Sequence, residues 1–294
     1  MTASAKIIVG ACAYNEENNI GNLLQNLTTK QELPEDSQIL VICSGCTDRT
    51  PEIVRSFGEN DGRIRLITEK TRLGKAHALN SLFGIARKSA EVLVLTNADA
   101  IPGPRSIKTL LSRLRESRAG AVFAQPIPNG VTGGLCSRIV NVIWRLHHVI
   151  SLLQRPKFSG ELCAIYTRYL QDLPANVATD EPYIELALCK HGSHVLYVPE
   201  SVVYIRCPTN VVDLLRHRKR IWTGHKQLQN VTGAKVSTSS FLNVLLAMPA
   251  LRVNEIFYAS IGAFLEMIAY IGAKIALSQS TIPYVWEPIR TTKT

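Results

Sequence analysis

Residues 7–11 read Ile-Ile-Val-Gly-Ala, and this short apolar run decides the fold because runs like it recur. Three more follow within the first hundred residues: Ile39-Leu-Val-Ile-Cys, Ile64-Arg-Leu-Ile and Val92-Leu-Val-Leu. Segments with the apolar spacing of amphipathic helices separate them, at residues 20–27, 51–57 and 76–86. Short apolar runs that alternate with helices indicate parallel strands covered on both faces. We therefore expect a Rossmann-like α/β fold with a mainly parallel central sheet.

Charge and composition narrow the choice of partner. The chain has 294 residues and a formal net charge of +10, which favours anionic partners such as a sugar nucleotide, an acidic membrane surface or nucleic acid. We find no nucleic-acid-binding motif and expect no nucleic-acid partner. The seven scattered cysteines and the absence of a signal-peptide pattern at the N-terminus predict reduced thiols in a cytoplasmic protein.

Polar segments follow the four apolar runs. They are Ala13-Tyr14-Asn15-Glu16-Glu17, Ser44-Gly45-Cys46-Thr47-Asp48, Arg72-Leu73-Gly74-Lys75 and Asn97-Ala98-Asp99-Ala100. Ligands of open parallel sheets bind at the carboxyl ends of the strands, so we expect these loops to share one edge. Each loop alone is better explained by helix capping or a turn. Together they supply the donors and acceptors that a nucleoside diphosphate requires.

Asp99 is the predicted metal ligand. A carboxylate just past a buried strand suits Mg²⁺ or Mn²⁺, which can bridge the two phosphates of a leaving nucleotide. The alternative is that Asp99 only caps the helix expected after Pro102-Gly103-Pro104. The neighbouring polar loops favour the metal site.

The chain resembles a family 2 glycosyltransferase of the GT-A fold. The resemblance rests on motifs that occur in order: Tyr14-Asn-Glu-Glu, Ser44-Gly-Cys-Thr-Asp-Arg-Thr, Gly74-Lys-Ala-His-Ala-Leu-Asn80, Asn97-Ala-Asp, Ser159-Gly-Glu-Leu-Cys-Ala-Ile, Thr179-Asp-Glu and Arg218-Lys-Arg-Ile-Trp222. It covers about the first 230 residues. The fold that it implies is a GT-A sandwich followed by a helical tail.

The resemblance assigns the donor site. It implies that Ala13, Tyr14, Asn15 and Glu16 line the base and ribose pocket of a UDP- or GDP-sugar, with Asp48 as a support. Ser44, Lys75, Asn97 and Ala98 are expected beside the nucleotide, and Asp99 on the metal. Two positions depart from the family pattern. Ser44 replaces an aspartate that faces the base, and Asn97 replaces the first acid of the usual Asp-x-Asp, which removes one charge near the metal.

A second cluster of acids begins an expected helix at Thr179-Asp180-Glu181. Acids in a first helical turn stabilise the helix dipole, and that is the alternative explanation. Inverting sugar transfer needs a carboxylate to accept the proton of the acceptor hydroxyl. The resemblance places this base on Glu181, with Asp180 as the second candidate and Glu185 as a distant third.

A third cluster is basic and runs from Arg216 to Arg220. Such a run is commonly a solvated or membrane-facing surface. The resemblance instead implies that Arg220 lies by the leaving diphosphate and that Trp222 faces the acceptor. Ile221 is inserted before Trp222 relative to the family motif.

The last part of the chain differs in composition. We predict a glycosyltransferase domain over residues 1–235 and a helical segment over 236–294. Residues 256–277 are mostly apolar and long enough to cross a bilayer, but Glu266 and Lys274 argue against a span. An interfacial helix is expected, with packing on the domain as the alternative. A membrane-surface helix favours a lipid-linked acceptor, although the sequence alone leaves the acceptor unknown.

These observations predict an inverting glycosyltransferase that transfers a hexose to an acceptor hydroxyl or phosphate. A sugar-1-phosphate nucleotidyltransferase is a related alternative, but it would carry a basic Gly-rich loop where this chain has Ala13-Tyr-Asn-Glu-Glu. A nonenzymatic, membrane-associated scaffold with a transferase fold is the other alternative. The acids at positions 99, 180 and 181 argue against it.

Overall fold

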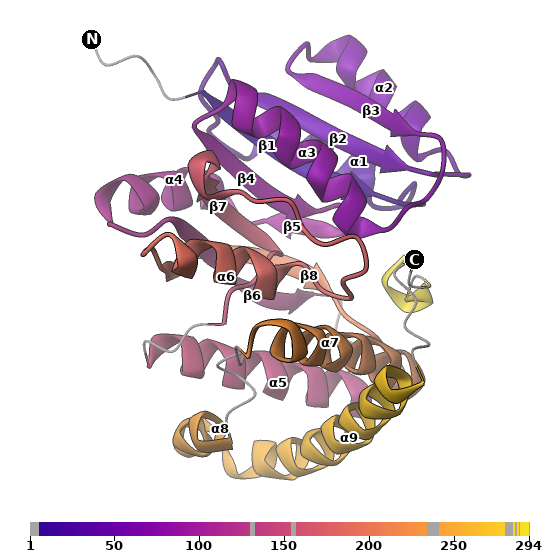
Figure 1. Cartoon of the computed structure of the whole chain (residues 1–294), viewed down its shortest axis with the longest axis vertical. Helices are drawn as coiled ribbons and strands as arrows, with labels where there is room; N and C mark the ends of the chain where they lie inside the picture. The colour runs from indigo at the N-terminus through magenta and orange to yellow at the C-terminus, as the bar shows by residue number, and fades with distance from the viewer. Residues whose placement is uncertain are drawn as a thin grey trace.

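The computed structural model describes residues 6–129, 133–153, 157–233, 241–279, 285, 287 and 289–293. Figure 1 shows an α/β sandwich above a layer of helices. The first half alternates as predicted, with strands β1 (Ile7–Ala13), β2 (Gln38–Ser44), β3 (Ile64–Glu69) and β4 (Val92–Asn97) and helices α1 (Ile20–Thr29), α2 (Thr50–Asn60) and α3 (Lys75–Ser89). These four strands are parallel neighbours. The predicted parallel core is therefore confirmed.

The second half extends the same sheet. Its elements are β5 (Ala100–Pro102), α4 (Ser106–Glu116), β6 (Ala121–Asn129), β7 (Leu162–Tyr166), the 3₁₀ turn η1 (Thr167–Tyr169), α6 (Glu181–Lys190) and β8 (Val195–Arg206). The strand order is β3-β2-β1-β4-β7-β6-β8-β5. Strand β7 runs antiparallel to both of its neighbours, and β5 runs antiparallel to β8. The sheet is thus mainly but not wholly parallel, as expected.

Two apolar layers bury the sheet because side chains alternate between its faces. Ile7 and Val9 of β1 pack with α1, α2 and α4 on one face. Ile8 points to the other face, where α3 and α6 cover it. Both faces are apolar, as a doubly covered sheet requires, and the polar side chains are left at the strand ends.

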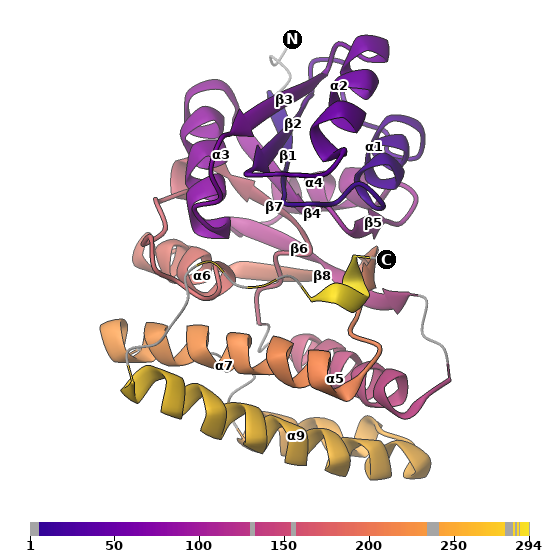
Figure 2. The same ribbon diagram turned by 90° about the vertical axis from the view of Figure 1, so that its right-hand side faces the viewer.

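The lower layer consists of α5 (Leu135–Leu152), α7 (Val211–Thr232), α8 (Phe241–Ala247), the 3₁₀ turn η3 (Met248–Ala250) and α9 (Val253–Ser278). Figures 1 and 2 show α7 and α9 lying side by side along the base of the molecule, with α5 next to them. The short 3₁₀ turn η4 (Arg290–Thr292) returns upward toward the sheet. The predicted domain boundary at residues 235–236 lies outside the described residues.

Helix α9 is the described helix that has the length and apolar composition to cross a membrane. It packs on α5 and α7 through small side chains, among them Gly262, Ala269 and Ala273. Leu265 is buried with them and Ile261 packs against the same cluster, but several large apolar side chains face outward, and Phe257 and Phe264 are 63% and 57% exposed. Most of the apolar face expected from the sequence therefore points away from the domain.

Of the two charges that argued against a membrane span, Lys274 is exposed and Glu266 is directed inward. Glu266 accepts a hydrogen bond from Trp222 Nε1 at 2.6 Å, and its other oxygen lies 2.5 Å from Nε of Arg218. Both partners lie on α7, so these polar contacts join α7 to α9. The outward face of α9 keeps its apolar side chains.

Candidate active site

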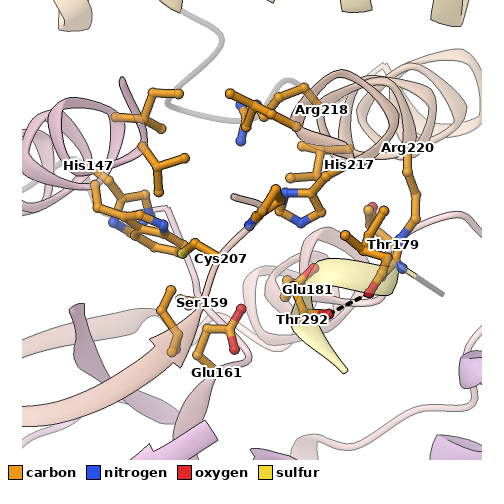
Figure 3. Close-up of a pocket in the computed structure, with 18 of the residues that line it drawn as sticks. His147, Ser159, Glu161, Thr179, Glu181, Cys207, His217, Arg218, Arg220 and Thr292 are labelled. Carbon is orange, nitrogen blue, oxygen red and sulfur yellow. Dashed lines mark hydrogen bonds between the residues drawn. The ribbon is translucent and has the colours of Figure 1, made fainter. Parts of the chain in front are cut away.

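A cavity of about 820 Å³ lies at the carboxyl ends of the first strands and extends down between the sheet and the helical layer. Most of the residues singled out in the sequence line it: Ala13, Tyr14, Glu16, Ser44, Lys75, Asn97, Ala98, Asp99, Glu181, Arg220 and Trp222. Figure 3 shows part of this cavity, with side chains from α5, α7 and the C-terminal turn pointing into it. Asn15, Asp48 and Asp180 do not line the cavity, but they belong to the same segments as residues that do.

Asn15 and Asp48 join the first two polar loops. Asn15 adopts a left-handed backbone with φ of 52°, which asparagine tolerates better than most residues. Its side-chain oxygen accepts a hydrogen bond of 2.9 Å from the backbone N–H of Thr47. Asp48 accepts hydrogen bonds from the Thr50 hydroxyl at 2.6 Å and from the Glu17 N–H at 3.0 Å. Burial opposes the charged form of Asp48, but these hydrogen bonds prevail and lower its pKa.

Glu16 is tied to the far end of the chain. Asn19 Nδ2 donates to Glu16 Oε2 at 2.8 Å, and Lys293 forms an ion pair with Oε1. Lys293 Nζ also donates to the Tyr14 carbonyl at 2.9 Å. Burial raises the pKa of Glu16, and Lys293 partly offsets this effect. No pattern in the sequence pointed to Lys293, because its role depends on contacts with residues nearly the whole chain away.

Asp99 is half-buried two residues after the end of β4. Burial raises the pKa of its carboxyl, while Lys293, Lys75 and Arg206 act in the opposite direction. Within the described parts of the chain, no group of three or more His, Cys, Asp or Glu side chains is arranged to hold a metal. Asp99 would therefore supply one protein ligand. This donor set fits Mg²⁺ or Mn²⁺, which commonly take one or two carboxylates and complete their shells with phosphate oxygens and water.

Asn97 has a partner that explains why it is not an acid. Its amide donates a 2.7 Å hydrogen bond to Glu161 Oε2, so an aspartate at this position would place two carboxylates in contact. Burial raises the pKa of Glu161 to about 7, helped by the charges of Asp99 and Glu181. The sequence motif at residues 159–165 contained Glu161 but did not indicate its role. The second acid near Asp99 thus comes from the segment that leads into β7.

Glu181 begins α6 and projects into the cavity. Asp180, beside it, is buried and lies 3.2 Å from Lys75 Nζ. Burial disfavours the charged lysine, but Asp180 and then Glu181 more than compensate and raise the pKa of Lys75. Gly160 leaves room for Glu181, since a Cβ at Gly160 would lie 3.1 Å from Glu181 Cγ. Asp180 thus pairs with Lys75, and Glu181 is left facing the cavity.

Arg220 and Trp222 both reach the cavity from α7. Arg220 has a buried Nε without a hydrogen-bond partner among the described residues, and its charge acts on Lys75. Trp222 packs edge-on against Tyr270 of α9 with ring centroids 5.2 Å apart, and its indole N–H is bonded to Glu266. Trp222 is therefore part of the wall between α7 and α9.

The lower part of the cavity holds basic side chains that the sequence did not single out as one group. His147 of α5, Lys157 before β7, and His217 and Arg218 of α7 all line it. Figure 3 shows His147, His217 and Arg218 pointing into the same space. Burial, reinforced by nearby cations, lowers the pKa of His147 and of His217 to about 3. Both imidazoles are therefore neutral at pH 7.

Comparisons with known proteins agree with this geometry. The family model described as Glycosyl transferase family 2 matches residues 8–171. This chain is 33% identical to the glycosyltransferase AglD of Haloferax volcanii over 153 residues. The aligned region is 49% of this chain and 24% of AglD. The mannosyltransferase PcManGT of Pyrobaculum calidifontis, solved with GDP-mannose and Mn²⁺, aligns over 99% of this chain and 84% of its own, with 22% identity and a TM-score of 0.62.

A second solved structure is glucosyl-3-phosphoglycerate synthase of Mycobacterium tuberculosis, in complex with Mn²⁺, UDP-glucose and phosphoglyceric acid. It aligns over 75% of this chain and 78% of its own, with 22% identity and a TM-score of 0.51. These likenesses show that the fold is GT-A, as the motifs implied.

Proposed function

The chain belongs to glycosyl transferase family 2, and we propose that it transfers a hexose with inversion from a UDP- or GDP-linked donor. The observation that carries the proposal is the composition of one cavity. Asp99 at a strand end, the Lys75–Asp180 pair and Glu181 at a helix start all meet there. This arrangement provides a donor site and a base within the same enclosed space.

The donor is proposed to bind across the strand ends. Tyr14 and the loops held by Asn15 and Asp48 would surround the base and ribose, and the guanidinium of Arg72 already lies 3.7 Å from the centre of the Tyr14 ring. Charge neutralisation of the diphosphate is the chemistry that Mg²⁺ or Mn²⁺ on Asp99 supplies. The solved relatives hold GDP-mannose and UDP-glucose with Mn²⁺, and they support both nucleotides equally.

Inversion requires attack on the anomeric carbon from the side opposite the leaving diphosphate. Glu181 is proposed to accept the proton of the attacking hydroxyl. Lys75 and Arg220 are cations on the donor side, where negative charge develops on the departing diphosphate. Opposite unit charges about 4 Å apart attract by about 4 kcal/mol at an effective dielectric of 20. Asp180, paired with Lys75, orients this lysine and does not act as the base.

The acceptor is proposed to be lipid-linked and the enzyme to work at the cytoplasmic face of a membrane. The exposed apolar face of α9 supports a helix that lies in the interface, because exposed apolar patches of this kind mark interaction surfaces. The cavity also continues between apolar side chains of α5, α8 and α9. A hydrocarbon chain that leaves the membrane along α9 would enter the cavity from this side.

The first test is thermal stability with UDP, GDP and their sugar conjugates, each with and without Mn²⁺. A ligand that binds the native state must raise the melting temperature. We expect a metal-dependent rise for one nucleotide that disappears in Asp99→Ala. Glu181→Gln should keep this rise and lose transfer. Metal-dependent binding with no hydrolysis or transfer by the wild type would instead favour the scaffold, and no binding at millimolar ligand would refute the donor site.

A further inference from the structure

The cavity has an apolar lobe that the donor site does not use. It lies between α5, α8 and α9 and is lined by Ile143, Leu146, Ile150, Val244, Met248 and Ala263. The polar donor groups at the strand ends line the other end of the same cavity. An apolar space that begins in the helical layer and ends at a proposed catalytic base suits an amphiphile, with its chain in the lobe and its head near Glu181.

The basic side chains between the two ends lack sufficient counter-charge. Among the described residues, no carboxylate forms an ion pair with Lys157. Burial and Arg218 lower the pKa of this lysine although Glu181, Glu266 and Glu185 act in the opposite direction. Glu266 is shared between Arg218 and Trp222. Nδ1 of His147 is buried without a partner in the part of the chain that the structure describes. Buried charges without partners are costly, so this group is built for an anion that arrives from outside.

This anion is not the donor diphosphate. Arg218 and Arg220 are two residues apart on α7, and side chains at that spacing point to different sides of a helix. Arg220 acts on Lys75 at the donor end, whereas Arg218 contacts Glu266 of α9 and acts on Lys157 and His147. One helix therefore carries an arginine toward each of two anion positions, and Glu181 lines the same cavity and is close enough to act on both Lys75 and Lys157.

We propose that Lys157, His217 and Arg218 form an acceptor subsite that binds the phosphate group of a lipid phosphate ester, with the hydrocarbon chain in the apolar lobe. An ammonium, a guanidinium and an imidazole donate from several directions, which suits the oxygens of a tetrahedral phosphate. The subsite orients the acceptor so that its attacking group reaches Glu181. The proposal rests on the proposed function, since the acceptor is identified by its position beside the base.

The test uses decyl phosphate below its micelle concentration, with decanol and inorganic phosphate as partial ligands. Binding to the full chain is measured by calorimetry in the presence of Mn²⁺ and the nucleotide that stabilises it. The variants are Lys157→Met and, as a matched control, Lys30→Met, which changes an exposed lysine at the C-terminal end of α1, outside the cavity lining. Because Lys157 has no ion-pair partner among the described residues, Lys157→Met is expected to fold, and His217→Gln provides a second variant.

We expect decyl phosphate to bind at least 10-fold more tightly than decanol or inorganic phosphate. Lys157→Met should weaken decyl phosphate by about 10- to 100-fold, as for a lost hydrogen bond to a charged group, and leave decanol unchanged. Lys30→Met should match the wild type. The proposal is overturned if Lys157→Met and His217→Gln bind decyl phosphate like the wild type, or if decanol binds as tightly. Nucleotide binding is measured separately. Failure of the proposed donor site would appear as an absence of nucleotide binding, and is thereby distinguished from failure of the acceptor subsite.

Discussion

Gly224 provides the sharpest test of how the proposed base is held. This residue lies in the middle of α7, where glycine is otherwise unfavourable by about 1 kcal/mol relative to alanine. A Cβ at Gly224 would lie 2.0 Å from Oγ1 of Thr179 and 2.9 Å from both its Cβ and its Cγ2. Rotation of the threonine side chain cannot relieve all three contacts. Thr179 immediately precedes Asp180 and Glu181, so a shift here moves the start of α6.

Gly224→Ala should therefore affect both stability and catalysis. Normal contact distances are about 3.5 Å, so the two segments must separate by about 1.5 Å. Overpacking of this kind costs about 1–3 kcal/mol. With an unfolding entropy of about 2.1 cal/mol/K per residue over 294 residues, each kcal/mol lowers the melting temperature by roughly 1.6 °C. A displacement near 1 Å at the base reduces kcat by about 100-fold.

The assay combines thermal unfolding with donor hydrolysis, in which water replaces the acceptor. Gly84→Ala is the matched control, since Gly84 also lies within a helix but a Cβ there meets no atom within 4 Å. It should raise stability by about 0.5–1 kcal/mol and leave kcat unchanged. In the double variant Gly224→Ala/Thr179→Ala, part of the loss should be recovered. Wild-type kcat and melting temperature in Gly224→Ala would refute the proposed role of this contact.

Three further changes test other parts of the structure. Asn97→Asp should destabilise the protein by about 1–3 kcal/mol, because it replaces the amide that donates to Glu161 with a second carboxylate. Urea unfolding should show that adding Glu161→Gln restores the stability. The pKa of His217 is lowered to about 3, so between pH 3 and 6.5 this residue binds more protons in the unfolded state than in the native state. Its contribution to the free energy of unfolding therefore falls as the pH falls, by up to about 1.4 kcal/mol per pH unit. His217→Gln should remove this contribution from the pH dependence of stability measured between about pH 6.5 and 5. Phe264→Ser/Ile271→Ser should reduce sedimentation with anionic liposomes, whereas Val231→Ser, which changes a more exposed apolar residue outside α9, should not. Equal sedimentation of the wild type and both variants would refute membrane contact through α9.

The sequence predicted those parts of the molecule in which neighbouring residues determine the structure. Parallel strands such as β1 and β2 are recognisable because both of their faces are apolar, and the loops after them are predictable because strand ends share an edge. Glu161 and Lys293 were missed for the opposite reason. Their significance arises from contacts with Asn97 and Glu16, which are distant in the chain. The sequence left open whether α9 packs on the domain or lies at a membrane. Part of its contact with α5 and α7 is made by small residues such as Ala269 and Ala273, which carry little apolar signal.

Helix α7 connects the two halves of the proposed reaction. Arg220 acts on the donor side, Arg218 lies at the proposed acceptor subsite, and Gly224 contacts the residue before Asp180 and Glu181. Because a helix is stiff over these two turns, the distance between the two anion positions is set by a single element. Helix α9 holds α7 through Glu266, so an amphiphile or membrane that displaces α9 would also move both arginines. A change that only loosens α9, such as Glu266→Gln, should therefore alter the affinity for decyl phosphate and the kcat of donor hydrolysis together. If only one of the two changes, α7 does not couple the sites.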